Sequence, residues 1–154
     1  MAFYETPIVI ESEAMQLGAV MTVPVSHGKV PAVILVGGSL SQLRDGELMD
    51  VLHPGSPRKA MKLLAHKLAR NGFASIRYDK PGYGQSHFFE KKFPQTDEHV
   101  AALQSIFEFL QQQPVVERNS IIIAGESAGA YYTCLLAKKG IEPSAYVLLG
   151  ALGS

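Results

Sequence analysis

The sequence predicts an α/β fold: a mostly parallel, twisted sheet with helices on both faces. The continuous apolar run Pro31–Val36 is typical of a strand that a parallel sheet buries on both faces. A pair of strands opens the chain, and strands then alternate with segments of helical spacing, which indicates an α/β architecture. No repeat, low-complexity tract or linker divides the chain, so residues 1–154 are expected to form a single domain.

The first part of the chain has the character of β structure. Tyr4–Ser12 and Leu17–Pro24 are expected to pair as a hairpin around a short polar turn. Pro31–Val36 is the next strand, and two glycines end it. The long polar loop Ser39–Ser56 follows, and loops of this length in compact domains are often functional.

Helices and strands alternate after this loop. Ser56 and Pro57 predict an N-cap and the first turn of a helix, and Gly72 predicts its left-handed stop. Thr96 or Asp97 can cap a second helix, whose apolar residues recur at helical spacing. The remaining predicted elements are the strands Phe73–Asp79, Ser120–Ala124 and Ala145–Leu149, the turn Pro81–Gly84, and a helix from about Ala128 to Lys139.

Composition excludes several classes of protein. With 154 residues, 47% of them hydrophobic and 18% charged, the chain can bury a substantial core and is not disordered. Fourteen basic and fourteen acidic side chains cancel, so nucleic acid and anionic membranes are not expected partners. Without a signal-peptide pattern or a membrane-spanning apolar run, a soluble, cytoplasmic protein is expected. The single cysteine, Cys134, is expected to be a buried small hydrophobe, with no disulfide or cysteine-based metal site.

The segment Gly125–Gly129 (GESAG) carries the strongest chemical signal. A serine with glycines two positions before and after it is typical of a sharp strand-to-helix turn that exposes the hydroxyl at the end of a sheet. Side chains at Gly125 and Gly129 would collide with the neighbouring strand and helix. At a helix N-terminus, Ser127 would lie beside backbone N–H groups that can stabilise an oxyanion. We interpret Ser127 as a nucleophile; the competing interpretation is an ordinary Gly/Ser turn.

Three segments together resemble the α/β-hydrolase superfamily, specifically its esterase-like and peptidase-like serine hydrolases. They are GESAG at Gly125–Gly129, PAVILVGGSLSQLRDG at Pro31–Gly46 and GFASIRYDKPGYGQS at Gly72–Ser86. The second is similar to the strand and oxyanion loop of that family, and the third to a segment ending in Arg-Tyr-Asp and Gly-x-Gly-x-Ser. The resemblance covers nearly the whole chain. It implies the first six of eight strands, in the spatial order 1-2-4-3-5-6.

The resemblance also implies roles for particular residues. Ser127 would be the acylated nucleophile, and the backbone N–H of Ala128 would be one oxyanion donor. The second donor would come from the loop after the Pro31–Val36 strand. The N–H of Ser39 is preferred for this role, and Gly38 and Leu40 are the alternatives.

Other residues of these segments are interpreted as structural. Gly37 departs from the family, which usually has at this position a histidine that braces the loop; the competing interpretation of Gly37 and Gly38 is a plain strand-ending turn. Arg44 and Asp45 are expected either to pair and stiffen the oxyanion loop or to form a solvated surface pair. Three residues are expected to turn the chain at the carboxyl edge of the sheet: Asp79, Gly82 and Gly84.

A serine nucleophile needs a base and a group that orients this base, and in the superfamily both follow the serine in the chain. The 27 residues after Ser127 contain no histidine and no aspartate. Their one carboxylate, Glu142, lies at the wrong end of a strand for a triad acid. His53 and His87, in loops near the carboxyl edge, are the candidates for a substitute base. The other histidines are interpreted as turn, surface or packing residues: His27, His66 and His99.

We therefore expect the N-terminal part of a longer hydrolase, an incomplete α/β-hydrolase domain whose acid and base come from another chain or a further segment. Ala145–Leu149 would be an open apolar edge able to pair with it. The leading hypothesis is a serine hydrolase of carboxylic esters, or of amides or thioesters, through an acyl-Ser127 intermediate, poorly active in isolation. The alternative is a non-catalytic binding module that uses this edge. The expected ligand is a small acyl substrate, and no metal or organic cofactor is implied.

Overall fold

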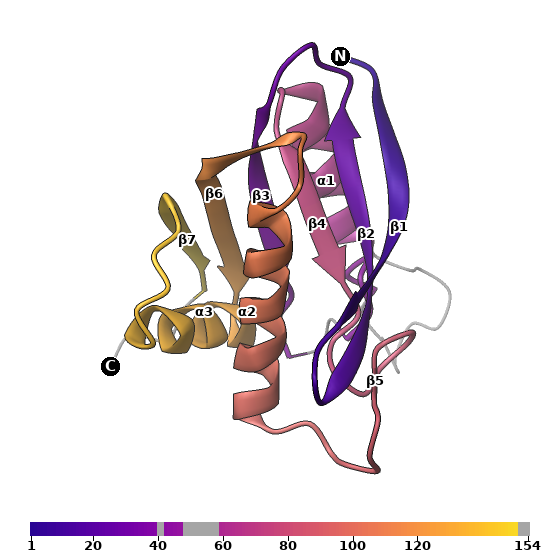
Figure 1. The fold of residues 1–154 in the computed structure, drawn as a ribbon, viewed down its shortest axis with the longest axis vertical. Helices are drawn as coiled ribbons and strands as arrows, with labels where there is room; N and C mark the ends of the chain where they lie inside the picture. The colour runs from indigo at the N-terminus through magenta and orange to yellow at the C-terminus, as the bar shows by residue number, and fades with distance from the viewer. Residues whose placement is uncertain (40–41, 48–58, 151–154) are drawn as a thin grey trace.

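Seven strands form one sheet in a computed structural model of the protein, which describes residues 1–39, 42–47 and 59–150 (Figure 1). Along the sheet the order is β1-β2-β4-β3-β6-β7, and β5 pairs with β2 outside this path. In chain order the elements are β1 (Phe3–Glu11), β2 (Met15–Pro24), β3 (Val30–Val36), α1 (Ala60–Arg70), β4 (Ala74–Tyr78), β5 (His87–Phe88), α2 (Thr96–Gln111), β6 (Val116–Glu126), α3 (Ala128–Lys138) and β7 (Ala145–Leu149).

The topology confirms the predicted fold class and strand order. β1 and β2 form the antiparallel opening hairpin, whereas β3 pairs in parallel with β4 and with β6, and β6 pairs in parallel with β7. Ile34 on β3 lies opposite Ile76 on β4 and Ile123 on β6. Because these strands are parallel, their carboxyl ends meet at one edge of the sheet, the lower edge in Figure 1.

The central strands are buried on both faces, as the apolar run of β3 predicted. Side chains alternate between the two faces of a strand. Ile34 therefore packs with α2 residues such as Leu103 in the larger core cluster, and Leu35 packs with Ala65 of α1 in the smaller one. Figure 1 shows α1 behind the sheet and α2 in front of it.

The outer strand β7 differs from the central ones. All five of its residues are exposed, and the exposed fraction of the four large side chains runs from 39% for Tyr146 to 51% for Leu149. Within the described residues no further strand pairs with its outer side. The expectation of an open apolar edge at Ala145–Leu149 is therefore met in this structure.

Some local predictions were wrong. Helix α1 begins at Ala60 with Lys59 at its N-cap, whereas Ser56 was expected there; Ser56 and Pro57 lie outside the described residues. The two-residue strand β5 was not predicted. Cys134 is exposed, because it shares the outward stripe of α3 with Tyr131 and Lys138, while positions such as Ala130, Thr133 and Leu136 are buried.

Among the helices of residues 1–39, 42–47 and 59–150, none has an apolar stretch of the length that a membrane-spanning helix needs.

Candidate active site

Ser127 occupies the tight turn between β6 and α3. Its φ of 51° and ψ of −115° make it the one non-glycine residue with positive φ in the described structure. This pair of angles lies outside the left-handed helical region that L-residues sometimes visit, so the backbone here is strained. The residue is exposed at the carboxyl edge of the sheet.

Two glycines allow the turn to close. A Cβ atom on Gly125 would lie 2.5 Å from the carbonyl oxygen of Gly129, and one on Gly129 would lie 2.2 Å from the carbonyl oxygen of Val36. Both distances are far below van der Waals contact, and both obstacles are main-chain atoms. The first turn of α3 therefore packs directly against the end of β3, which places Ser127 beside the loop that follows β3.

The main chain around Ser127 begins helix α3. The N–H of Ser127 donates to the carbonyl of Leu149 at 2.8 Å, and the Ser127 carbonyl accepts from the N–H groups of Ala130 and Tyr131. The Ser127 side chain does not cap the helix. Within the described residues the N–H of Ala128 has no acceptor. It lies at the positive end of the helix, where an anion is stabilised.

Side chains from two other segments hold Gly38 in the loop after β3. Its N–H donates to Oε2 of Glu126 at 3.0 Å, and its carbonyl accepts from Nζ of Lys80. The N–H of Gly38 is thus already bound, which argues against this alternative for the second oxyanion donor. Ser39 keeps its place as candidate, and Leu40 lies outside the described residues.

Lys80 is buried, with 3% of its surface exposed. Burial lowers its pKa to about 8, and the charge of Glu126 opposes this shift. Its backbone N–H donates to the carbonyl of Gln42 at 3.0 Å, and the Gln42 side chain in turn donates to the carbonyl of Ser39. Lys80 therefore contacts the loop at two points. Sequence reasoning missed the roles of Lys80 and Glu126, since their partner Gly38 is 42 and 88 positions away.

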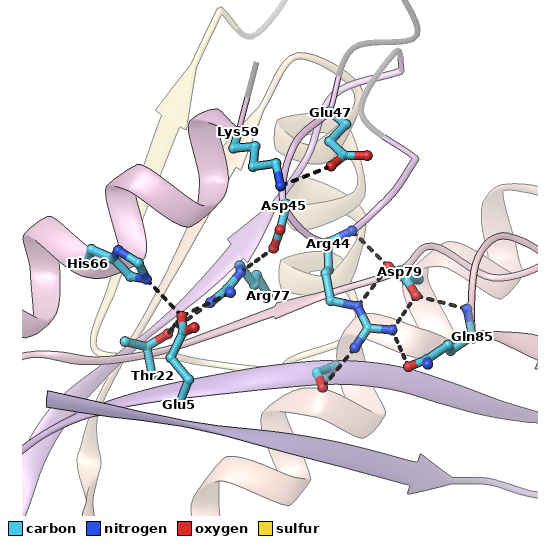
Figure 2. A network of polar contacts seen from close by, with 11 residues as sticks. Glu5, Thr22, Arg44, Asp45, Glu47, Lys59, His66, Arg77, Asp79 and Gln85 are labelled. Atoms are coloured by element: carbon cyan, nitrogen blue, oxygen red, sulfur yellow. Dashed lines mark hydrogen bonds and ion pairs between the residues drawn. The ribbon is translucent and has the colours of Figure 1, made fainter. Parts of the chain in front are cut away.

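Asp79 organises the turn after β4 (Figure 2). Its carboxylate accepts from the Arg44 guanidinium and backbone N–H, the latter at 2.8 Å, and from the backbone N–H of Gln85 at 2.9 Å. Burial alone would raise the pKa of Asp79, but these hydrogen bonds outweigh it and hold the pKa below its ordinary value. Gly84 approaches so closely that a Cβ there would lie within 3 Å of this carboxylate. The structural interpretation of Asp79 and Gly84 agrees with this geometry.

The expected Arg44–Asp45 pair does not form. Arg44 binds Asp79, and Asp45 instead accepts from Nε of Arg77 at 2.9 Å (Figure 2). Arg44 and Asp45 are adjacent in this loop and point to opposite sides, so each binds a different residue at the end of β4. Arg77, buried with 2% of its surface exposed, also contacts Glu5 at 3.0 Å. The loop is therefore anchored by two ion pairs rather than stiffened by one.

No described histidine makes a hydrogen bond to Ser127. His87 is exposed on β5, where its ring contacts Phe89. His99 is buried in α2 and stacks on Tyr132 at 4.6 Å, and burial lowers its pKa to about 4, helped by the charge of Lys80 and opposed by that of Glu98. His53 lies outside the described residues. Nor do the described residues form a cluster of three side chains that could hold a metal ion.

Comparison with known families decides the identity of this fold. A family model described as serine aminopeptidase, S33, matches residues 57–153. The chain belongs to this family of α/β hydrolases. The resemblance in the sequence is thereby confirmed at the level of the superfamily. No curated protein matches the chain.

Solved structures share the hydrolase fold at low identity. A hypothetical protein from Pseudomonas aeruginosa is 16% identical, with a TM-score of 0.79, over 97% of this chain and 43% of its own. The α/β hydrolase GrgF from Penicillium sp. sh18 is 16% identical, with a TM-score of 0.72, over 99% and 47%. A dienelactone hydrolase-like promiscuous phosphotriesterase from metagenomic libraries is 17% identical, with a TM-score of 0.73, over 98% and 60%. This chain thus spans less than two thirds of the length of each of these structures.

Proposed function

We propose that this chain carries the nucleophile of a serine hydrolase that cleaves carboxylic esters, or amides or thioesters, through an acyl-Ser127 intermediate. The observation that carries the proposal is the backbone of Ser127, strained, exposed and placed at the N-terminus of α3. Strain of this kind persists only where the surrounding structure enforces it, and it is concentrated at functional sites. Membership of a hydrolase family supports the same function.

The proposed reaction has two steps. Oγ of Ser127 attacks the carbonyl carbon of the substrate, the Ser127 proton passes to a base, and the bond to the leaving alcohol, amine or thiol breaks as that group takes up a proton. Water then releases the acid and restores the hydroxyl. The backbone N–H groups of Ala128 and Ser39 would stabilise the oxyanion of each tetrahedral intermediate.

We propose further that the acid and the base of the reaction are supplied by another chain or by a further segment, and not by residues 1–154. Two observations support this: no described histidine hydrogen-bonds to Ser127, and the chain spans only 43–60% of three solved structures that share its fold. A second chain or a further segment that adds a strand at the exposed β7 edge would lie two strand positions from β6, which Ser127 follows; β7 lies between them, and its Leu149 carbonyl accepts from the Ser127 N–H.

The neighbours suggest which substrates to try first. One similar structure is Est1E from Butyrivibrio proteoclasticus with ferulic acid bound, which is 20% identical to this chain, and another is the dienelactone hydrolase-like promiscuous phosphotriesterase. Ferulic acid is a small carboxylic acid, and a dienelactone is a small cyclic ester. We therefore propose a small acyl compound as the substrate class.

Labelling with a fluorophosphonate probe tests the proposal. We expect covalent modification of the wild-type chain that is lost in Ser127→Ala and kept in Ser26→Ala, a variant of an exposed serine in another turn. If the chain itself supplies no base, the labelling rate should rise about tenfold per pH unit between pH 6 and 8. A histidine base would instead give a plateau above its pKa of about 6.5.

The same experiment separates the two hypotheses. Ser127 that stays unmodified at every pH in the folded protein, with every natural partner chain present, would support the alternative of a binding module. A plateau near neutral pH would support the hydrolase but contradict the external base.

A further inference from the structure

Gly38 is held from both sides by oppositely charged side chains, and this arrangement has no role in the reaction as proposed above. Glu126, the residue before Ser127, accepts the Gly38 N–H at 3.0 Å, while the Lys80 ammonium donates to the Gly38 carbonyl. A Cβ on Gly38 would lie 2.7 Å from Oε2 of Glu126. A larger residue here would therefore have to displace the Glu126 carboxylate. We call these two contacts the Gly38 clamp.

The carbonyl of Gly38 belongs to the same peptide group as the N–H of Ser39. A trans peptide group is planar, so its N–H points opposite to its C=O. Lys80 is buried, and its ammonium donates to the Gly38 carbonyl. By holding the Gly38 carbonyl it therefore directs the Ser39 N–H away from itself. A charged donor on a carbonyl also polarises the peptide group and makes its N–H a stronger donor.

We propose that Lys80 and Glu126 are positioning residues that orient the Ser39 N–H, and that Lys80 also polarises it, as the second oxyanion donor for Ser127. This inference rests on the proposed function. Lys80 acts through the Gly38–Ser39 peptide group and touches no reacting atom. Glu126 fixes the preceding amide and links the loop to the residue beside the nucleophile. The Gln42 side chain completes the support, because it donates to the Ser39 carbonyl.

The clamp gives the site a dependence on the charge of Lys80. The groups that face its ammonium are the Glu126 carboxylate at the end of β6, the Gly38 carbonyl after β3, and His99 from α2, which burial keeps neutral at pH 7 since its pKa is about 4. Lys80 is therefore charged below its pKa of about 8 and neutral above it. The advantage that it confers should fade as pH rises through that value.

Labelling kinetics of Lys80→Met test the proposal. We expect this variant to react with the fluorophosphonate about 10 to 100 times more slowly than wild type at pH 7, less than the loss of a whole oxyanion donor. The ratio of the two rates should fall toward one as pH rises above about 8. Lys92→Met, which removes an exposed lysine paired with Glu98, is the matched control and should react like wild type.

Glu126→Gln provides a second variant, which should fold because Glu126 is exposed. The amide oxygen of glutamine can still accept from Gly38, but the loss of its charge lowers the pKa of Lys80 further. The ratio of the Glu126→Gln labelling rate to the Lys80→Met labelling rate should therefore fall to one at a lower pH than the corresponding ratio for wild type. A pH dependence identical in both proteins would contradict the role assigned to Glu126.

Amide hydrogen exchange gives a readout that does not depend on Ser127 chemistry. In Lys80→Met we expect exchange at Gly38 to speed up at least tenfold, while exchange at Ile34 in the middle of β3 is unchanged. Unchanged Gly38 exchange, or equal labelling rates at pH 7, would overturn the proposal. If wild-type Ser127 does not label even with every natural partner chain present, the proposed function fails, and the Gly38 exchange rate still decides whether the clamp exists.

Discussion

Two turns at the carboxyl edge of the sheet are built in different ways. The turn around Ser127 is closed by steric contact: main-chain atoms fill the space that side chains on Gly125 and Gly129 would need. The turn from Asp79 to Ser86 is closed by hydrogen bonds. Ser86 Oγ donates to the Asp79 carbonyl at 2.6 Å and accepts from the N–H of Gly18 at 3.0 Å.

The difference predicts how each turn tolerates change. The turn around Ser127 packs against main-chain atoms that cannot move aside, so one added methyl group disturbs it whatever the chemistry of the new residue. The turn from Asp79 to Ser86 depends on hydrogen-bond donors that match acceptors, so a substitution of nearly identical shape can still disrupt it. Substitutions that change only volume or only polarity should therefore separate the two.

Gly129→Ala should have the largest effect. The new Cβ would lie 2.2 Å from the carbonyl oxygen and 2.8 Å from the carbonyl carbon of Val36, and these backbone atoms belong to a central strand. Overpacking usually costs about 1–3 kcal/mol, and we expect the free energy of unfolding to fall by about 3 kcal/mol or more because the obstacle is main chain. Urea titration measures it. Gly28→Ala, with nothing within 4 Å of the new Cβ, should change it by less than about 0.5 kcal/mol.

Asp79→Asn tests the polar turn with almost no change in volume. An amide can match only some of the donors that surround Asp79, and its own NH₂ group would face Arg44 or the Gln85 N–H. A buried donor left unpaired costs about 1–3 kcal/mol, so we expect a loss of about 2 kcal/mol in urea titration. An equal stability of the variant and wild type would show that these hydrogen bonds do not hold the turn.

The pH dependence of stability should report the same carboxylate. Since the pKa of Asp79 is lower in the folded protein than its ordinary value, its contribution is complete above the unfolded pKa of about 3.9. It is lost as pH falls through the folded pKa. The difference in unfolding free energy between wild type and Asp79→Asn should therefore be constant from pH 5 to 7 and shrink below about pH 4. A difference that grows on acidification would contradict the direction of the shift.

Local patterns were sufficient to predict the strained turn and its flanking elements. The predicted strand Ala145–Leu149 matches β7, and α3 begins at Ala128 as expected, because apolar runs and glycines act over a few residues. The partners of Arg44 could not be predicted in the same way. Arg44 lies 35 positions from Asp79, and only the folded sheet brings the two loops together.

The Gly38 clamp illustrates the same limit. The sequence contains Lys80 within a family-like segment and Glu126 beside the expected nucleophile, but nothing local distinguishes them from surface charges. Exposure of Cys134 was mispredicted for a related reason: helical spacing indicates that one stripe is buried, and only the packing of α3 decides which stripe.

Ser127→Gly should have the smallest effect and the opposite sign. Glycine adopts the φ of 51° and ψ of −115° found at this position without the strain of about 1–3 kcal/mol that a side chain brings. Glycine also lowers stability by about 0.5–1 kcal/mol, because it increases the entropy of the unfolded chain. We expect Ser127→Gly to be more stable than Ser127→Ala by about 1 kcal/mol. Alanine is the appropriate reference, because it removes the same hydroxyl and keeps the strain. If the two variants were equally stable, the turn would be unstrained, and the strongest argument for Ser127 as a nucleophile would be lost.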